Sequence, residues 1–422
     1  MGCGGKRVDA LVNGSHGLHP GTKGLPASAL RQRSPTNPEI LPVSLSLLIK
    51  PAGPDCNLDC SYCFYKPLLN SLYSDSTRHR MTIETFELLV KQFMPLAGPS
   101  ASFGWQGGEP TLMGLPFFQT ALEIQRAYAQ PRQHVVNALQ TNGTLLNDSW
   151  FRFLRKNRIL VGLSLDGPRD LHDLYRVTEA GTATWARVLR SSRLLREHRV
   201  EFNVLVVLTS AAASRAREIE HFMRKEGLTW TQYIPVIECD SATGLPTDYS
   251  ITPEDYGVFL CEMFDRWAAD WPPRSYIREF DEWLMVHAGY RHPSCIYSRN
   301  CGSYVVVEHN GDVFCCDFSV DPHWLLGNIH SITLAEMISS DKFQSFAARH
   351  SDLDSECRAC PHLALCNGGC PQHRIRISGN HQSPTYHCEG LKKFFVYSNK
   401  RFRAMARRRK QEMQLAGHLP ED

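Results

Sequence analysis

Three cysteines near the start of the chain are spaced for an iron-sulfur cluster. They stand in Cys56-Asn-Leu-Asp-Cys60-Ser-Tyr-Cys63, directly after the apolar run 45–49. Three thiolates can hold three irons of a four-iron, four-sulfide cluster, and because no fourth cysteine lies nearby in the sequence, one iron stays open. An open iron can chelate the amino and carboxylate groups of S-adenosylmethionine and deliver one electron, which splits off a 5′-deoxyadenosyl radical.

A zinc site is the main alternative for these thiols. Zinc prefers four closed ligands, usually from two CxxC pairs, and this Cx3Cx2C segment lacks the second pair. A disulfide framework does not suit a chain of 422 residues in which we find no secretory signal. The spacing therefore favours the iron-sulfur cluster.

A second group of cysteines lies far downstream. Its nine members are Cys295, Cys301, Cys315, Cys316, Cys357, Cys360, Cys366, Cys370 and Cys388. Among them, the segment 304–314 is typical of a β-hairpin with an Asn310-Gly311 turn. Eight of the nine thiols could hold two four-iron clusters. One or two zinc ribbons would use similar CxxC pairs and hairpins, so spacing alone leaves these two interpretations about equal.

Composition limits the class of protein. With 42% hydrophobic and 21% charged residues, the 422-residue chain can form one large domain and a smaller one. Its 46 basic and 43 acidic residues are too nearly balanced to indicate a nucleic-acid surface, and apolar runs such as 204–208 are too short for a membrane span. Fifteen cysteines, mostly at metal-ligand spacing, indicate a reducing compartment, and we expect the cytoplasm.

Strand-like and helical segments alternate over the first half of the chain. We expect strands at 43–49, 101–106, 134–140, 159–165, 201–208 and 229–236, with helices such as 82–93 and 185–198 between them. Repeated strand, helix, strand units predict parallel strands with right-handed crossovers. Six such units predict an α/β fold, a partial TIM-like (β/α)6 barrel, followed by a small Cys-rich domain.

The distinctive short motifs all fall where these strands end. They are 56–63, Gly107-Gly108-Glu109-Pro110, Gln140-Thr-Asn-Gly143, Ser164-Leu-Asp-Gly167 and Ile234-Pro-Val-Ile237. Barrel enzymes carry their chemistry at the C-terminal ends of the strands. Each motif alone could be an ordinary turn, but their common position predicts one active site.

These motifs carry a family resemblance. The segment 56–65 and the Gly107-Gly108-Glu109-Pro110 turn resemble the radical S-adenosylmethionine superfamily, and the cysteines from 295 to 388 resemble its SPASM extension, which carries two auxiliary clusters. Residues 43 to about 395 are most similar to the anaerobic sulfatase-maturating enzymes. That similarity also rests on Trp105-Gln106, His172-Asp-Leu-Tyr-Arg176, Gln232-Tyr-Ile-Pro235 and Cys316-Asp317.

The resemblance implies a reaction. Those enzymes oxidise a cysteine or serine of a sulfatase to Cα-formylglycine, with S-adenosylmethionine and three 4Fe-4S clusters as cofactors. Asp317 matches the family's general base, a task that suits a carboxylate, although an Asp after a strand commonly caps a turn. The implied partners are an unfolded or nascent sulfatase polypeptide and an electron donor such as flavodoxin or ferredoxin, with no nucleic acid and no membrane.

The resemblance also implies site residues. Gly107, Gly108 and Glu109 would lie along the methionine moiety, with Glu109 meeting its ammonium; a plain Gly-rich turn is the alternative. Ser164 and Arg176 would contact the carboxylate and ribose region, unless Arg176 forms a surface ion pair. Backbone at Tyr62 and Ile237 would bracket the adenine. Tyr65 and Gln106 would face the peptide, although an aromatic residue at a strand end more often packs.

By the same pattern, three sets of thiols would hold the clusters. Cys56, Cys60 and Cys63 would hold the first. One auxiliary cluster would take Cys295, Cys301, Cys316 and Cys370, and the other Cys357, Cys360, Cys366 and Cys388. Because Cys315 precedes Cys316 directly, the sequence leaves open which of these two thiols is the ligand.

The chain is expected to divide into five parts. They are a disordered leader at 1–40, the barrel at 41–240, a helical linker at 241–294, the auxiliary-cluster domain at 295–390 and a basic helical tail at 391–422. Two other functions stay open. One is a related peptide-modifying enzyme that forms a thioether or a carbon-carbon crosslink, and the other is a Cys-rich metal scaffold that binds a partner without catalysis.

Overall fold

The fold is described from a computed structural model, which describes residues 45–74, 76–240 and 243–415. The expected leader at 1–40 lies outside these residues. One continuous sheet, with strand order β10-β9-β8-β1-β2-β3-β4-β5-β6-β7, runs through the molecule. The strands are β1 (Ser46–Lys50), β2 (Ser100–Trp105), β3 (His134–Thr141), β4 (Leu160–Ser164), β5 (Phe202–Leu208), β6 (Trp230–Pro235), β7 (Tyr276–Ile277), β8 (Tyr304–Glu308), β9 (Asp312–Phe314) and β10 (Leu325–Asn328).

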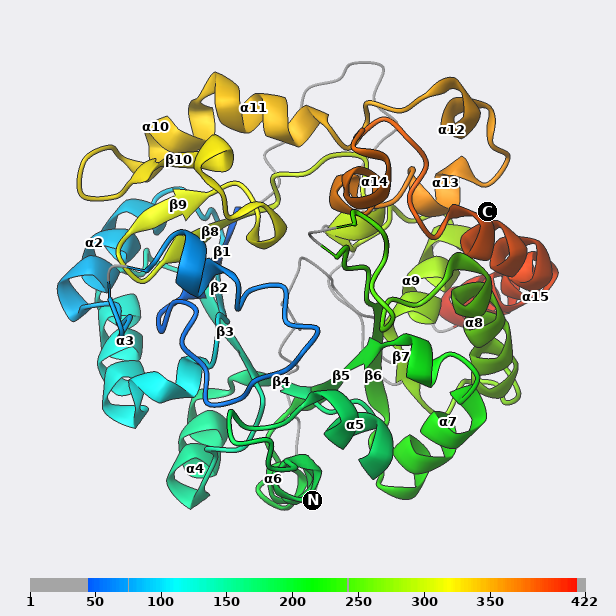
Figure 1. Cartoon of the computed structure of the whole chain (residues 1–422), viewed down its shortest axis with the longest axis horizontal. Coiled ribbons are helices and arrows are strands. Elements are labelled where there is room, and N and C mark those ends of the chain that lie inside the picture. The colour runs from blue at the N-terminus through cyan, green and yellow to red at the C-terminus, as the bar shows by residue number, and fades with distance from the viewer. Residues whose placement is uncertain (1–44, 75, 241–242, 416–422) are drawn as a thin grey trace.

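Strands β1 to β6 are parallel and follow one another in sequence order. Figure 1 shows them curving around the centre of the molecule, with α2, α3, α4, α7 and α8 on the outer side. The helices are α1 (Leu68–Ser71), α2 (Ile83–Phe93), α3 (Leu115–Tyr128), α4 (Asp148–Asn157), α5 (Arg169–Tyr175), α6 (Trp185–Glu197), α7 (Ala216–Lys225), α8 (Pro253–Trp267), α9 (Arg278–His287), α10 (Leu334–Ser339), α11 (Asp341–Ala348), α12 (Ser355–Ala359), α13 (Leu363–Cys366), α14 (Pro371–Ser378) and α15 (Cys388–Leu415).

The six expected strands are confirmed, with ends within a few residues of those predicted. Helix α2 begins after Thr82, whose hydroxyl accepts from the Thr85 backbone N–H and caps the helix. Its buried face of Phe86, Leu89, Val90 and Phe93 packs against the sheet. This apolar spacing is what makes the segment helical and fixes which side faces the core.

The sheet extends beyond the six expected strands on both sides. The short strand β7 pairs in parallel with β6, so the segment expected as a helical linker also adds to the sheet. Strand β8 pairs in parallel with β1 over its whole length, with Glu308 opposite Lys50. The 304–314 hairpin is confirmed as the antiparallel pair β8 and β9. It joins the Cys-rich region to the barrel through backbone hydrogen bonds.

The last helix, α15, is packed into the core. Helices α15 and α8 lie side by side (Figure 1), and Phe394 and Phe402 contact Phe264 of α8 with ring centroids 5.7 and 4.6 Å apart. Both phenylalanines are fully buried. The tail from 391 is therefore helical as far as Leu415. Its first half packs against α8 on the outer side of the barrel. No helix in the part of the chain that the structure describes is long and apolar enough to cross a membrane.

Candidate active site

The loop after β1 holds Cys56, Cys60 and Cys63 at the C-terminal end of the barrel. Their thiols interact electrostatically with one another. Burial raises the pKa of the Cys56 thiol to about 12, and the charge of Glu109 adds to the rise. Burial also raises the pKa of Cys60 to about 11. Bound iron would reverse this penalty, because a nearby metal charge stabilises thiolates.

The Gly107-Gly108-Glu109-Pro110 turn supports this loop by backbone contact. The Gly108 N–H donates to the Gly53 carbonyl at 2.9 Å, and the Glu109 N–H donates to the Asp55 carbonyl at 2.8 Å. A Cβ atom on Gly108 would lie only 1.9 Å from the Asp55 carbonyl oxygen. Glycine is therefore required here for the approach of two backbones, whether or not the turn also contacts a methionine moiety.

Glu109 is fully buried and strongly hydrogen-bonded. Its Oε1 accepts from the backbone N–H and hydroxyl of Thr111 and from the Thr141 hydroxyl, and its Oε2 accepts from the Asn142 N–H at 2.8 Å. Burial raises its pKa, and these hydrogen bonds oppose the rise. Glu109 thus ties the β2 loop to the β3 loop, and its contact with an ammonium group stays a prediction.

Arg176 forms a buried ion pair rather than a surface one. Its Nε and Nη2 donate to both carboxylate oxygens of Asp166 at 2.8 and 3.2 Å. The Tyr62 hydroxyl also donates to Asp166, and the Val207 N–H donates to it at 2.9 Å. Burial alone would raise the pKa of Asp166, but the charge and hydrogen bonds of Arg176, the His172 charge and the Tyr62 hydrogen bond together outweigh burial, so the pKa is lowered. Ser164 lies buried at the end of β4, two residues before Asp166.

We expect Asp166→Ala to lower the free energy of unfolding by about 3–5 kcal/mol, because the substitution leaves the Arg176 charge buried without its partner. Asp170→Ala is the matched control, since Asp170 pairs with Arg215 while 65% exposed, and exposed pairs contribute only about 0–1 kcal/mol. Urea unfolding followed by circular dichroism measures both. Equal losses in the two variants would contradict the buried pair.

Asp317 lies in a buried 3₁₀ turn, Asp317–Ser319, directly after Cys316. The Tyr304 hydroxyl donates to Asp317 Oδ1 at 2.7 Å and lies 3.1 Å from the Cys316 sulfur. Among the described residues, the hydrogen bonds of the Asp317 side chain come from Tyr304 and Cys316 rather than from a backbone N–H of the turn. Tyr304 therefore fixes the carboxylate next to the thiol.

Lys50, the last residue of β1, connects the residues expected to face the peptide. It is 1% exposed, donates to Gln106 Oε1 at 2.9 Å, and lies over the Tyr65 ring with Nζ 4.4 Å from the centroid. Burial lowers its pKa, while the charges of Asp317 and Glu308 oppose the shift. Gln106 in turn donates to Gln140 Oε1 at 2.8 Å. Tyr65 is buried and donates its hydroxyl to Glu308.

The downstream thiols form two groups. Cys370 interacts electrostatically with Cys295, Cys301 and Cys316. In the second group, Cys357, Cys360, Cys366 and Cys388 interact with one another and line one small cavity. These are the two sets that the sequence resemblance implies. Cys315 is 1% exposed within the hydrophobic core, whereas Cys316 contacts Tyr304 and Asp317.

Ile237 lies apart from these contacts. Its side chain is buried, and its carbonyl accepts from the Arg376 guanidinium of α14, which also pairs with Glu238. The backbone at Ile237 thus joins the barrel to the Cys-rich region. A contact with adenine stays a prediction, as do the contacts of Tyr62, whose ring faces Arg176 at 5.4 Å.

Sequence reasoning did not single out Lys50, Asp166 or Tyr304. Asp166 lies within the Ser164-Leu-Asp-Gly167 motif, and an aspartate after a strand, ten residues before an arginine, could have indicated the pair. The position of Lys50 could have been recognised from the sequence. It follows an apolar strand and precedes the cysteine loop, and a residue there lies at the active-site end of the barrel. Tyr304 had no such signal, because its contact with Asp317 depends on the turn after β9.

The residues present fit the expected cofactors. All three groups consist of thiols, the soft ligands that iron-sulfur clusters take. The first group has three thiols, and the Asp166 and Arg176 pair lies beside it, since both charges act on Cys60. A cluster with one open iron would therefore be held near charged groups suited to a zwitterionic ligand.

Comparison with known proteins identifies the family of the chain. Residues 51–220 match the radical SAM superfamily and residues 295–361 match an iron-sulfur cluster-binding domain, SPASM. A serine-type anaerobic sulfatase-maturating enzyme of Bacteroides thetaiotaomicron is 34% identical over 84% of this chain and 89% of its own. A cysteine-type enzyme of Clostridium perfringens is 37% identical over 84% of this chain and 96% of its own.

A solved structure of native anSMEcpe with bound AdoMet and Cp18Cys peptide has a TM-score of 0.80 and 36% identity, covering 86% of this chain and 99% of the other. SuiB of Streptococcus suis, bound to S-adenosylmethionine, shares the fold at a TM-score of 0.57 and 17% identity. Radical SAM proteins use S-adenosylmethionine with a 4Fe-4S cluster, and the SPASM domain binds auxiliary clusters. The chain is therefore a radical SAM enzyme with a SPASM domain, and it belongs to the family of anaerobic sulfatase-maturating enzymes.

Proposed function

We propose that this enzyme oxidises a cysteine or serine of a sulfatase to Cα-formylglycine. The observation that carries the proposal is the placement of Asp317. Its carboxylate is buried beside Cys316 of the proposed auxiliary ligand set, and it interacts electrostatically with Lys50 and Tyr65. Lys50 also interacts with Cys63, and Tyr65 lies two residues after Cys63 in the loop. A base is thus held between the two kinds of cluster site.

We infer that Cys56, Cys60 and Cys63 hold the cluster that binds S-adenosylmethionine, and that Cys316 rather than Cys315 joins Cys295, Cys301 and Cys370 in an auxiliary set. Cys357, Cys360, Cys366 and Cys388 form the other auxiliary set. When bound, these groups supply an oxidant that removes a hydrogen atom from carbon and an acceptor for one electron. Gly107, Gly108, Glu109, Ser164 and Arg176, with the backbone at Tyr62 and Ile237, would surround the bound S-adenosylmethionine.

The chain's own residues would handle the proton and the peptide. Asp317 accepts the proton of the target thiol or hydroxyl, since an ionised carboxylate has free lone pairs for it. Tyr304 holds the carboxylate in place through its 2.7 Å hydrogen bond. Gln106 and Tyr65, ordered by Lys50, present the wall of the peptide site. Burial of these groups keeps water from the reacting carbon.

The partners follow from this chemistry. We propose that the target segment of the sulfatase enters unfolded or nascent, since a side chain must reach a site whose base is buried. An external one-electron donor such as flavodoxin or ferredoxin would reduce the first cluster. Because reduced thiols are needed in three groups, we place the enzyme in the cytoplasm.

A second candidate is a peptide crosslinking enzyme that forms a thioether or a carbon-carbon bond. The likeness to SuiB shows the fold alone and does not argue for this activity. The buried Cys316-Asp317 pair favours oxidation, because loss of a proton and an electron from the target residue requires a base at the site. A scaffold without catalysis is not compatible with the family to which the chain belongs.

The test is a peptide assay. We expect anaerobically reconstituted protein, given S-adenosylmethionine and a strong reductant, to convert a sulfatase-derived peptide containing Cys-x-Pro-x-Arg with a mass change that matches thiol-to-aldehyde conversion. The serine version of the same peptide, run in parallel, shows whether one or both targets are used. If 5′-deoxyadenosine forms while both peptides stay unmodified, the crosslinking alternative is favoured instead.

A further inference from the structure

Glu308 is a buried carboxylate outside the residues assigned above. It ends β8 directly opposite Lys50 of β1, and it is 0% exposed. Its Oε1 accepts from the Tyr65 hydroxyl, while its Oε2 is buried without a hydrogen-bond partner. Glu308 therefore contacts the proposed peptide site on one side and keeps one oxygen free on the other.

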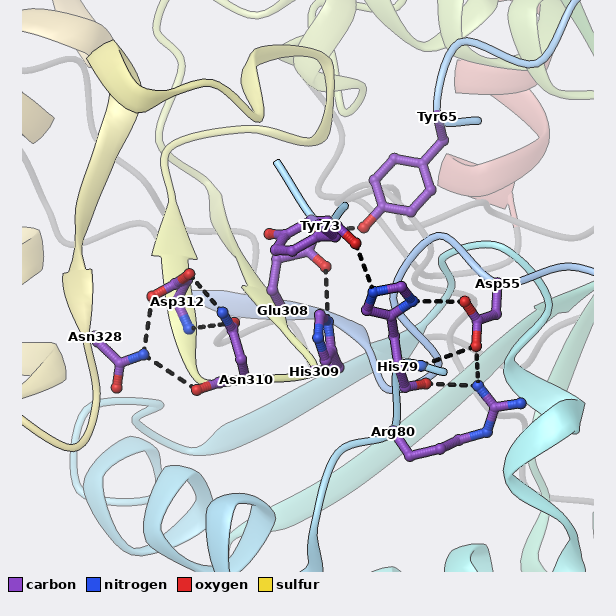
Figure 2. Close-up of polar contacts among 10 residues, drawn as sticks. All are labelled: Asp55, Tyr65, Tyr73, His79, Arg80, Glu308, His309, Asn310, Asp312 and Asn328. Carbon is purple, nitrogen blue, oxygen red and sulfur yellow. Dashed lines mark hydrogen bonds and ion pairs between the residues drawn. The ribbon is translucent and has the colours of Figure 1, made fainter. Parts of the chain in front are cut away.

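The free oxygen points toward His309. The His309 Nδ1 lies 3.9 Å from Glu308 Oε2 and is also buried without a hydrogen-bond partner. Figure 2 shows the two side chains next to each other, with Tyr65 beyond Glu308. Because 3.9 Å is longer than a hydrogen bond, a small rotation of either side chain would join a donor to an acceptor.

His309 also lines a cavity that reaches the surface. The cavity has a volume of about 240 Å³, and its walls include Tyr73, His79 and the exposed residues Ser76 and Asn310. The His309 ring packs against Tyr73 and His79 with centroids 5.0 and 4.9 Å apart. His309 thus stands between a buried carboxylate and solvent.

His79 is not equivalent to His309, although both line the cavity. Its Nδ1 contacts Asp55 at 2.6 Å and its Nε2 contacts the Tyr73 carbonyl at 3.0 Å, so both ring nitrogens are occupied (Figure 2). Asp55 is also bound by Arg80. This second network braces the start of the cysteine loop and has no free nitrogen with which to carry a proton.

The proposed reaction must release a proton from a closed site. Conversion of –CH2–SH to –CH=S breaks one C–H and one S–H bond. The carbon-bound hydrogen would leave as an atom to the cofactor when it is bound, one electron would be taken up by the auxiliary cluster that Cys295, Cys301, Cys316 and Cys370 would hold, and the thiol hydrogen would leave as a proton. Asp317, Lys50, Tyr65 and Glu308 are all buried. A proton left there would oppose the next turnover, so a route to solvent is needed.

We propose that Glu308 and His309 form the exit by which this proton reaches solvent. The inference rests on the proposed function. The proton that Asp317 takes from the target passes to Glu308, which accepts from the Tyr65 hydroxyl and lies directly opposite Lys50, the buried lysine that interacts with both carboxylates. Rotation then passes the proton from Glu308 Oε2 to His309 Nδ1, and the other ring nitrogen gives it to water in the cavity.

Chemical rescue tests this route. We expect His309→Ala to lower the rate of peptide conversion about 10-fold in weakly buffered solution, within the usual contribution of a proton-transferring side chain. Added imidazole should restore the rate, because it fills the space left by the ring and carries protons in its place. His309→Gln should be equally slow and resist rescue, since its side chain still occupies the space. Asp312→Asn changes a charge in the same cavity and should behave like the unaltered enzyme.

A second readout needs no bound cofactor. Imidazole should raise the Tm of cluster-free His309→Ala, because it binds the folded state only, and should leave the Tm of His309→Gln unchanged. Glu308→Gln, which keeps the oxygen that accepts from Tyr65 but cannot take a proton, should also slow conversion without rescue by imidazole.

The outcomes separate the two proposals. If the unaltered enzyme converts neither peptide, the proposed function fails. If it converts the peptide and His309→Ala is equally fast, the exit route is wrong while the proposed function stands. If imidazole raises the Tm of His309→Ala but does not restore a lowered rate, His309 supports the fold and does not carry the proton, which also overturns the route.

Discussion

Replacement of Cys56, Cys60 and Cys63 together by alanine should abolish 5′-deoxyadenosine formation. These thiols are the proposed ligands of the only set with three members, and they interact with one another in the loop after β1. Without them no iron is left to bind S-adenosylmethionine. Iron content should fall from about twelve to about eight atoms per chain, because the downstream thiols lie on other elements.

The matched control uses cysteines outside the three sets. Cys239 and Cys261 belong to none of the three proposed ligand sets. The Cys239 thiol donates to the Arg376 carbonyl at 3.0 Å, and Cys261 lies within α8. The double variant Cys239→Ala and Cys261→Ala should keep all its iron and its cleavage of S-adenosylmethionine. Persistent 5′-deoxyadenosine formation by the triple variant would show that the first cluster is held elsewhere.

The barrel fold could be predicted because its strands and helices are each encoded by a short stretch of sequence. Apolar runs such as 204–208 alternate with amphipathic helices, and that order alone implies parallel strands with crossovers. The motifs at the strand ends then predicted where the site lies. The β8 and β9 hairpin was also local, since an Asn310-Gly311 turn between alternating segments is a short-range signal.

The pairing of β8 with β1 could not be predicted in the same way. It joins residues more than 250 positions apart, Lys50 with Glu308, and no turn or spacing encodes such a contact. Yet this pairing creates the buried Lys50 and Glu308 neighbourhood and brings the turn that carries Asp317 to the barrel. The buried charges of Lys50 and Glu308 could therefore be recognised only in the structure.

The glycines of the Gly107-Gly108 turn show a related limit. The resemblance implied that they lie along a methionine moiety, and that contact stays a prediction; the structure shows a different close approach, between Gly108 and the backbone of Asp55 in the cysteine loop. The sequence could not say which backbone approaches. Likewise, a surface ion pair was the alternative for Arg176, and the structure shows a buried pair with Asp166 instead, while the contact of Arg176 with a ligand stays a prediction. The sequence indicates which residue types are present, but the contacts of Gly108 with Asp55 and of Arg176 with Asp166 depend on tertiary packing.

Asp317→Asn should lower peptide oxidation about 10²- to 10⁴-fold, the usual range for loss of a general base. Asparagine keeps the size of the side chain and an oxygen that can accept from Tyr304, so the fold and the auxiliary iron should be retained. It cannot accept the proton of the target residue. Cleavage of S-adenosylmethionine should continue, because the cysteine loop is unchanged, so 5′-deoxyadenosine should accumulate without modified peptide.

Tyr304→Phe is the graded companion to this variant. It leaves the Asp317 carboxylate in place but removes its 2.7 Å hydrogen bond, a loss worth about 0.5–1.5 kcal/mol. Peptide oxidation should therefore fall only about 2- to 13-fold. Measured together by mass spectrometry of the peptide and chromatography of 5′-deoxyadenosine, the two variants separate the base from its support. An unchanged product yield in Asp317→Asn would remove this carboxylate from the reaction, and Tyr304 would then matter only for packing beside Cys316.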